Sequence, residues 1–290
     1  MLDFILNPNA GSTKGKKVRK VLRIIEDYLQ KNNIPYTVHR TNYKNHAKNL
    51  TSNLITNGAT DIIGIGGDGT LHEILNGFHD FDKCNLGLIP CGTGNDFAGA
   101  LGLPTKPIEA LKLILNKEPV YTDYMQMPGV RGINLIGTGI DVKVLQYYAN
   151  LKHKTAFGYT ACLIKALFKF DFMEFDAEYN GEKKHFESFI ACVANGVSCG
   201  GGLKLSPNSD VGDGKLNFVA VDKVKRSKIP GMFLKLKKSK ILECPGVTHE
   251  LVEEIKVTGK DAGLVQVDGE IYENIPFEIK IVHNTLKMYR

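Results

Sequence analysis

The sequence lacks any run of eighteen or more apolar residues, the length that an ordinary membrane-spanning helix needs. The best candidate, residues 159–170, is short and is interrupted by Lys165. Residues 1–11 lack the basic segment and the long apolar core of a secretion signal, so we expect a first strand and a turn there. These absences argue against a membrane span, and we expect a cytoplasmic protein.

Cysteine is present, but not in the patterns of a zinc site or a disulfide scaffold. The chain holds six cysteines with no C-x-x-C pair and no cluster of histidines. We therefore expect reduced thiols that are mostly buried. The six are Cys84, Cys91, Cys162, Cys192, Cys199 and Cys244. The chain also shows no fixed-period repeat and no low-complexity tract.

The composition that is present indicates a folded protein. A chain of 290 residues with 43% hydrophobic residues can build a large core, as one big domain or two ordinary ones. The formal net charge of +6 fits phosphate ligands, an anionic membrane surface or nucleic acid, and does not choose among them.

The first half of the chain alternates strand and helix patterns. Residues 2–7, 35–41 and 60–67 are apolar or alternating and predict strands, whereas residues 17–33 and 46–58 have helical spacing. Strands that alternate with helices imply a parallel sheet.

From about Tyr121 the pattern changes to short β-rich runs, which predict a second, mainly antiparallel domain. Residues 154–170 interrupt these runs as a helical candidate. The runs are residues 133–140, 176–196, 214–221, 253–259, 264–270 and 277–282.

The glycine-rich stretch "GIGGDGTLHEILNG", residues 64–77, follows the third predicted strand and precedes a predicted helix from Leu71 to Phe78. Glycine allows a ligand to approach the backbone, and free N–H groups at a helix start attract phosphate. A tight turn without a ligand is the alternative. A carboxylate repels phosphate unless a cation lies between them, so Asp68 points to magnesium nearby. The spacing matches neither a P-loop nor a Rossmann fingerprint.

Two further glycine-rich turns, residues 7–17 and 90–102, also follow apolar runs. Turns at the carboxyl ends of parallel strands would line one crevice, where one phosphate-rich ligand could touch all three. Lysines of the first turn would supply charge or would merely be solvated. These lysines are Lys14, Lys16 and Lys17. Asn95 and Asp96 could belong to the site or could be helix caps.

Five motifs together resemble the diacylglycerol kinase catalytic-domain family of lipid kinases, which includes bacterial lipid kinases and sphingosine kinases. They are "NPNAG" at 7–11, "GGDGTLHEILNG" at 66–77, "PCGTGNDFA" at 90–98, "GGGLKLSPNSDVGDGKL" at 200–216 and "VDGE" at 267–270. "GGDGT" alone is shared with NAD kinases and is similar to a turn in phosphofructokinases. The resemblance covers essentially the whole chain.

The resemblance implies an α/β plus β fold, with an N-terminal three-layer α/β nucleotide-binding domain and a C-terminal β-sandwich. The expected boundaries are residues 1–122 for the ATP-binding domain, completed by residues 277–290, and residues 123–276 for the lipid-substrate domain. The implied activity is transfer of the γ-phosphate of ATP, with Mg²⁺, to a lipid alcohol. Diacylglycerol is the expected acceptor, in phospholipid metabolism.

The resemblance also implies roles for single residues. Glu270 would be the base on the lipid hydroxyl, and Asp68 would act with Asp96 and Asp123 in an acidic network that organises a catalytic magnesium through water. A second magnesium would be held by the Asp213 side chain and the carbonyls of Asp210 and Lys215. The implied ATP-binding residues are Asn7, Pro8, Asn9, Ala10, Gly11, Thr41, Gly67, Asp68, Gly69, Thr70, Leu71, His72, Glu73 and Thr93.

Some residues permit a plainer interpretation or depart from the family. "DG" is a strong hairpin signal, so Glu270 and the "GDGK" turn could be ordinary turn residues. The family often has an arginine where this chain has Gly99 and Ala100, and Lys14, Lys16 or Lys152 could replace that cation. His72 stands where asparagine is common, and it still donates and accepts hydrogen bonds.

The segment "KVKRSKIPGMFLKLKKSK", residues 223–240, holds eight Lys or Arg, no acid, and several apolar residues. It could be a solvated basic face or a surface for transient contact with an anionic membrane, which would make the protein peripheral at the inner face of the membrane. The expected partner is a lipid alcohol, and no nucleic acid is expected. The alternatives are a kinase for a soluble substrate, similar to NAD kinase, and a catalytically silent nucleotide-binding regulator. The sequence leaves the oligomeric state open, a homodimer included.

Overall fold

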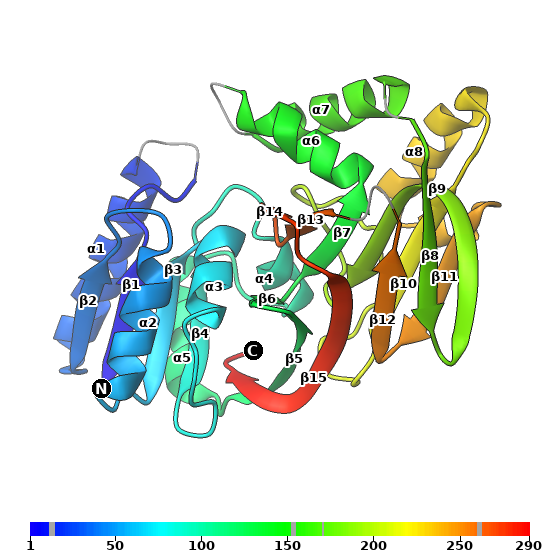
Figure 1. Ribbon diagram of the computed structural model, residues 1–290. Coiled ribbons are helices and arrows are strands. Elements are labelled where there is room, and N and C mark those ends of the chain that lie inside the picture. The colour runs from blue at the N-terminus through cyan, green and yellow to red at the C-terminus, as the bar shows by residue number, and fades with distance from the viewer. Residues whose placement is uncertain (12–14, 152–154, 170, 260–262) are drawn as a thin grey trace. The chain divides into compact units, whose positions relative to one another are not determined.

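The structure, a computed structural model, describes residues 1–11, 15–151, 155–169, 171–259 and 263–290. The chain forms two compact units, one of residues 1–123 and 283–290 and the other of residues 124–282 (Figure 1). The chain leaves the first unit within strand β5 (Val120–Met127) and returns to it within β15 (Phe277–Met288).

The first unit contains a parallel sheet in the order β4-β3-β1-β2, beside which Met288 of β15 pairs in parallel with Leu86. The strands are β1 (Leu2–Leu6), β2 (Tyr36–Arg40), β3 (Asp61–Gly66) and β4 (Asn85–Pro90). The three inner strands are almost wholly buried, because a parallel sheet is covered on both faces.

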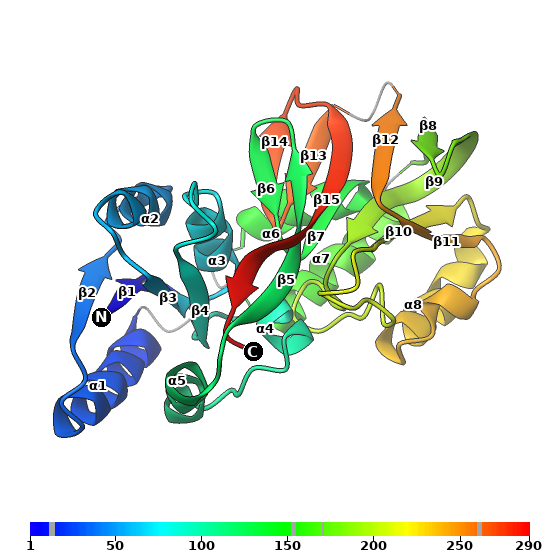
Figure 2. The same cartoon turned by 90° about the horizontal axis from the view of Figure 1, so that it is seen from below.

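Helices cover both faces of this sheet, with α1 and α5 on one side and α2 and α3 on the other (Figure 2). The helices are α1 (Lys16–Lys31), α2 (His46–Thr56), α3 (Asp68–Leu75), α4 (Asp96–Ala100) and α5 (Pro107–Asn116). The predicted helices at 17–33 and 46–58 are confirmed. Helix α3 begins at Asp68, three residues before the predicted start at Leu71, so Asp68 and Thr70 lie in its first turn.

The second unit is built mainly from antiparallel strands, as predicted. They are β6 (Val130–Gly132), β7 (Leu135–Gly139), β8 (Met173–Tyr179), β9 (Glu182–Ala194), β10 (Leu216–Asp222), β11 (Val247–Val252), β12 (Glu254–Thr258), β13 (Leu264–Val267) and β14 (Glu270–Glu273). The long strand β9 pairs with β7, β8 and β10. The strands enclose a core that includes Phe175, Phe186 and Phe218.

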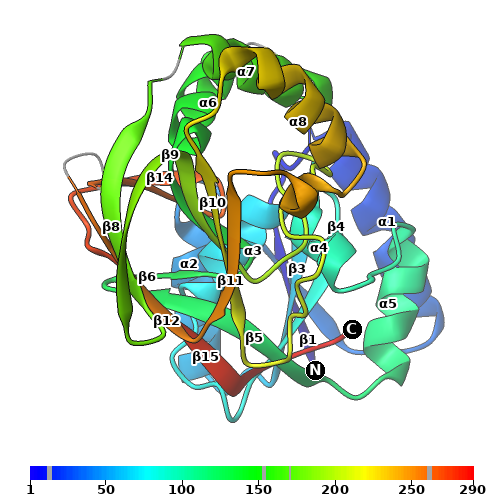
Figure 3. The same ribbon diagram turned by 90° about the vertical axis from the view of Figure 1, so that its right-hand side faces the viewer.

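Three helices of the second unit share another apolar cluster with the face of β9 and β10 that is turned away from this core (Figure 3). They are α6 (Ile140–Ala149), α7 (Ala156–Lys169) and α8 (Ile229–Lys237), with 3-10 turns at η1 (Arg226–Lys228) and η2 (Ile241–Glu243). The helical candidate at 154–170 is confirmed by α7 within the described residues; its end residues 154 and 170 lie outside them. None of the helices in the described ranges is long and apolar enough to cross a membrane.

The predicted fold class, an α/β part followed by a β-sandwich-like part, is confirmed. The prediction for cysteine is also confirmed, since all six thiols are free and only Cys199 is not fully buried.

Candidate active site

Three glycine-rich turns meet at the carboxyl ends of β1, β3 and β4, as the sequence predicts. The backbones of the second and third turns touch: a methyl group on Gly67 would lie 2.8 Å from the Cα of Gly92. The first turn is held to the second by a 3.2 Å hydrogen bond from Asn7 Nδ2 to Thr70 Oγ1. The close approach of Gly67 and Gly92 leaves no room for larger side chains, and the three turns lie together at the end of the sheet where a ligand could approach the backbone.

Asp68 ties the second turn to the third. Its Oδ2 accepts the backbone N–H of Asp96 at 3.2 Å, and its Oδ1 accepts that of Phe97 at 3.1 Å. Asn95 occupies the N-cap position of α4 but makes no side-chain cap bond to that helix; its Oδ1 accepts the N–H of Gly92. The carboxylate of Asp68 therefore supplies the anchor that a local cap would give, across 28 residues of sequence.

A polar pocket of about 230 Å³ lies beside the first and second turns. Its lining residues are Asn7, Asn9, Thr41, Asn42, Tyr43, Lys44, Ala47, Thr70 and Glu73. Five of them are predicted ATP-binding residues: Asn7, Asn9, Thr41, Thr70 and Glu73. The volume suits part of a nucleotide, because pockets that enclose a whole drug-sized ligand occupy roughly 300–1,000 Å³.

The wall of this pocket is held by Glu73. Its Oε1 accepts the N–H of Asn45 at 2.9 Å and its Oε2 accepts the N–H of Ala47 at 3.1 Å, at the start of α2. A carboxylate at a helix N-terminus is favoured by the helix dipole. Since both oxygens accept backbone N–H groups, Glu73 positions the segment from Asn42 to Lys44 that lines the pocket.

The other predicted ATP-binding residues fall into two groups. Pro8, Ala10 and Gly11 belong to the first turn; Gly67, Gly69 and Thr93 belong to the second and third. The side chains of Leu71 and His72, in contrast, are buried in α3, with 0% and 3% exposure, and do not line the pocket. The sequence patterns do not indicate Asn42, Tyr43 and Lys44, because these residues follow β2 without a glycine motif; Thr41, just before them, is the only signal.

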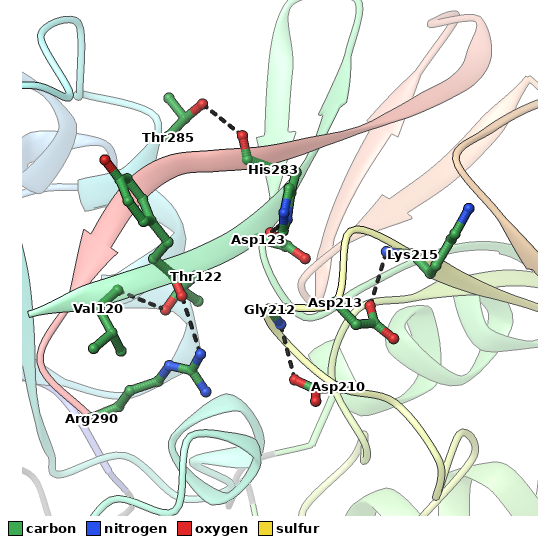
Figure 4. A network of polar contacts seen from close by, with 11 residues as sticks. Val120, Thr122, Asp123, Asp210, Gly212, Asp213, Lys215, His283, Thr285 and Arg290 are labelled. Carbon is green, nitrogen blue, oxygen red and sulfur yellow. Dashed lines mark hydrogen bonds and ion pairs between the residues drawn. The ribbon is translucent and has the colours of Figure 1, made fainter.

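Asp123 is the last residue of segment 1–123 of the first unit. It pairs with a residue that the sequence did not indicate. Its fully buried carboxylate lies 2.7 Å from Nδ1 of His283, the first residue of the returning segment (Figure 4). Asp96 is also buried, at 8% exposure. No group of three or more His, Cys, Asp or Glu side chains among the described residues could hold a metal ion directly.

The turn at residues 210–215 in the second unit is organised by its own carboxylates. Asp210 Oδ1 accepts the N–H of Gly212 at 3.0 Å, and Asp213 Oδ1 accepts the N–H of Lys215 at 2.9 Å (Figure 4). Both aspartates are exposed. The turn is thus preformed, with carboxylate and carbonyl oxygens of the kind that magnesium prefers.

Glu270 is the first residue of β14 and follows a two-residue hairpin turn. Asp268 and Gly269 form that turn with φ of 50° and 91°, the left-handed values that such hairpins require. Asp268 accepts the backbone N–H groups of residues 133, 134 and 135 at 2.9, 2.8 and 3.1 Å. The hairpin interpretation is correct for the backbone, and it leaves the partly exposed Glu270 side chain at a rigid position.

Gly99, where the family often has an arginine, lies in α4 with nothing within 4 Å of the place where a Cβ would stand. Of the lysines considered as replacements, Lys16 is exposed, while Lys14 and Lys152 lie outside the described residues. Lys17 does reach the third turn: its Nζ lies 3.4 Å from the carbonyl oxygen of Gly92.

Comparison with known families agrees with this geometry. Residues 2–127 match the model of the diacylglycerol kinase catalytic domain, and residues 134–290 match the YegS C-terminal NAD kinase beta sandwich-like domain. The chain is 28% identical over 280 residues to a diacylglycerol kinase of Bacillus subtilis (strain 168), which covers 95% of this chain and 91% of the relative. It is 26% identical over 276 residues to a probable YegS-like lipid kinase of Enterobacter sp. (strain 638), covering 92% and 90%.

Solved structures show a similar fold. A diacylglycerol kinase of Bacillus anthracis str. Sterne superposes with a TM-score of 0.74 at 22% identity, over 99% of this chain and 96% of that one. An NAD kinase of Archaeoglobus fulgidus in complex with ATP gives a TM-score of 0.53 at 16% identity, over 100% and 94%. At these identities the likeness concerns the fold alone.

Proposed function

The chain belongs to the diacylglycerol kinase catalytic domain family, joined to a YegS-type C-terminal domain, and on that basis we propose that it is an ATP-dependent lipid kinase. The relatives are named diacylglycerol kinase or lipid kinase, which supports phosphoryl transfer to a lipid. Our specific proposal is transfer of the γ-phosphate of ATP to the hydroxyl of diacylglycerol, giving phosphatidic acid.

The observation that carries this proposal is the meeting of three glycine-rich turns at one end of a parallel sheet. Gly67 and Gly92 approach too closely for side chains, and Asp68 fixes the third turn through the amides of Asp96 and Phe97. Ligands of open α/β sheets bind at this end of the strands. The adjoining polar pocket supports a nucleotide in particular, because Asn, Thr and backbone groups can bind ribose and phosphate oxygens.

In the proposed reaction the residues of this chain bind and orient the substrates. Asn7, Asn9, Thr41 and Thr70 would hold the nucleotide, with the cation of Lys17 at the third turn. Glu270 would take the proton of the lipid hydroxyl as its oxygen forms the new bond to the γ-phosphorus. The bond from that phosphorus to the β–γ bridging oxygen breaks, and ADP leaves.

Magnesium, when bound, would neutralise charge on the transferred group. The carboxylates suit magnesium chemically, but they do not form a complete binding site. Asp68 and Asp123 already take part in hydrogen bonds, and no cluster of three side chains among the described residues could bind the ion directly. Asp68, Asp96 and Asp123 would therefore act through water and substrate oxygens, as Mg²⁺ commonly retains several waters. The exposed 210–215 turn would hold a separate, structural ion.

A lipid kinase must reach a bilayer, and the helices of the second unit support such contact. On α7, Phe157, Ile164 and Phe168 are 84%, 42% and 54% exposed at spacings that place them on one helix face. Residues 142–170 contain lysines and no acidic residue, as do residues 223–240 around α8. An exposed apolar stripe within a purely basic segment fits an anionic membrane surface.

The basic segment 223–240 is only partly available for docking. Leu234 is 59% exposed, whereas Ile229 is buried and Leu236 packs against the cluster beneath the helices. The cations would therefore make most of the contact there, and the α7 stripe would supply apolar insertion. We propose that the protein attaches peripherally and reversibly through these two helices.

The proposed function is tested by radiolabelled ATP and a panel of acceptors in mixed micelles: diacylglycerol, phosphatidylglycerol, a sphingoid base, a polyprenol and, as a soluble acceptor, NAD. We expect a labelled lipid with the mobility and mass of phosphatidic acid. Labelling of NAD alone would replace the proposal by a soluble-substrate kinase. ATP binding without any labelled product would indicate a silent regulator.

A further inference from the structure

Asp141 is a buried acidic residue of the second unit for which the proposed reaction has no role. It lies in the first turn of α6, at 7% exposure, directly after β7. Its Oδ1 accepts the N–H of Val142 at 2.8 Å, and its Oδ2 is buried without a hydrogen-bond partner. Such a buried carboxyl is costly, so a merely local benefit to α6 is a weak explanation.

The carboxyl of Asp141 fills the space above a glycine. A methyl group on Gly137 of β7 would collide with Asp141 Oδ2. Gly137 is the register partner of Gln266 on β13, and Gln266 is itself 4% exposed. The absence of a side chain at Gly137 therefore leaves room for the carboxyl of Asp141 on the face of the sheet that carries the Gln266 side chain, and the Gln266 amide favours the ionised form of that carboxyl.

Gln266 in turn binds the hairpin turn that precedes Glu270. Its Oε1 accepts the backbone N–H of Gly269 at 2.9 Å. Gly269 is the residue before Glu270, and its neighbour Asp268 is fixed by three backbone N–H groups of residues 133–135. The turn is thus held at two points: at Asp268 by the start of β7, and at Gly269 by Gln266.

The side-chain amide of glutamine has an oxygen that accepts and a nitrogen that donates. Only one of its two orientations lets the oxygen accept the N–H of Gly269. Oε1 must face the N–H of Gly269, which directs Nε2 away as a donor. The buried carboxyl of Asp141, which lies over Gly137 on the same face of the sheet, is the acceptor toward which Nε2 would be directed. If Asp141 were apolar, the Gln266 amide could rotate, and the N–H of Gly269 would lose its acceptor.

We propose that Asp141 is a positioning residue for Glu270, acting through Gln266 and Gly269. The inference rests on the proposed function in one respect, since Glu270 is taken as the base. A misplacement of about 1 Å at a reacting group can cost roughly 100-fold in rate. We therefore expect Asp141→Ala to lower kcat for lipid phosphorylation by about 10- to 100-fold with little change in KM for ATP.

Asp141→Asn is the conservative variant, because its one amide oxygen can face Gln266 if it gives up the bond from the N–H of Val142. It should restore kcat to within about threefold of the wild type. Gln266→Met removes the acceptor of Gly269 by a different substitution of similar size. Because the two residues act in series, Asp141→Ala with Gln266→Met should lose no more activity than the more impaired single variant.

Hydrogen exchange of the full-length protein without substrates tests the network independently of activity. In Asp141→Ala and Gln266→Met the peptide 264–273 should exchange roughly tenfold faster, while β8 should not change. Unchanged exchange, or losses of kcat that add in the double variant, would overturn the proposal. A wild type without lipid kinase activity would refute the proposed function, and the exchange measurement would still decide whether Asp141 holds the turn.

Discussion

The carboxylate of Asp68 accepts the backbone N–H of Phe97 at 3.1 Å, which joins the second glycine-rich turn to the third. This contact gives Asp68 a structural task beside the proposed organisation of magnesium. Asp68→Asn keeps one acceptor oxygen and loses the other, together with the charge. We expect phosphoryl transfer to fall by at least about 100-fold and the free energy of unfolding to fall by about 1–3 kcal/mol.

The two effects of Asp68→Asn are separated by measuring turnover and denaturant unfolding on the same preparation. Asp27→Asn, an exposed change on α1, is the matched control and should alter neither. A well-folded Asp68→Asn variant with near-normal turnover would remove Asp68 from the catalytic machinery. Asp68→Ala removes both acceptors, so we expect it to be less stable than Asp68→Asn.

Glu270→Gln keeps the size and hydrogen-bonding capacity of the side chain but removes its basicity. We expect turnover to fall by roughly two to four orders of magnitude, the usual contribution of a general base, with ATP binding little changed. The matched control is Glu273→Gln, on the same strand and more exposed. The pH dependence of kcat is measured alongside; equal turnover and an equal pH profile in the two variants would exclude Glu270 as the base.

Gly99→Arg tests whether the departure from the family pattern weakens phosphate binding. A Cβ at this position meets nothing within 4 Å, so a side chain can begin there without a backbone conflict. We expect KM for ATP to decrease by a factor of about two to ten, because an additional exposed cation would attract the phosphates of ATP. Gly99→Gln is long and neutral and serves as the control. The same KM in both variants would show that no cation is missing.

The titration of Asp141 predicts how stability depends on pH. Burial raises its pKa from the usual 3.8 to about 7, so the folded state holds a proton that the unfolded state has released. The resulting stabilisation is present below about pH 4 and is lost as pH rises through about 7. The facing strands β7 and β13 carry no charged side chain, and Cys192 of β9 has a pKa well above its usual value.

Asp141→Asn cannot ionise, so it should lack this pH dependence. We expect the urea midpoint of Asp141→Asn, measured at pH 5, 6, 7 and 8, to rise relative to that of the wild type as the pH rises. A constant difference across this range would mean that Asp141 keeps an ordinary pKa in the folded protein.

The sequence predicted the parts of the site that lie on regular patterns. Glycine turns after apolar runs located all three turns, and helical spacing located α1, α2 and α7. It could not predict the pairing of Asp123 with His283, because that contact joins residues 160 positions apart. It also could not predict that Asp68 accepts the backbone N–H groups at the start of α4. Capping residues are recognised within a few positions of a helix start, whereas Asp68 lies in another turn.

Burial, which the sequence does not report directly, decides which of the other predicted side chains can face a ligand. The motif around Leu71 and His72 resembles a binding sequence, yet a helix shows only one side to a ligand, and these side chains point into the core. Likewise, Ile229 and Leu236 look available for a membrane in the basic segment, but they complete the cluster beneath α8. Composition alone does not tell which face of a helix is covered.

Docking to membranes is predicted to need both helices described above. Replacing Phe157 and Phe168 of α7 with Ser removes the apolar stripe, and replacing Lys235, Lys237, Lys238 and Lys240 with Gln removes four cations. Each basic residue near an anionic surface contributes on the order of 1 kcal/mol, so the lysine variant should bind vesicles of 30 per cent anionic lipid at least about tenfold more weakly at low salt. The loss should shrink at high salt, where charges are screened.

The stripe variant should behave differently, because apolar insertion is not screened by salt. Its binding should fall at both salt concentrations and on neutral vesicles as well. The matched control removes the same charge elsewhere: Lys20, Lys31, Lys48 and Lys117 are exposed lysines of the first unit, and replacing them with Gln should leave docking close to that of the wild type.

Co-sedimentation with vesicles measures all three variants, and ATP affinity should stay constant throughout. Equal losses in the control and the α8 lysine variant would mean that net charge alone drives binding, and full binding by the stripe variant would exclude α7 from the docking surface.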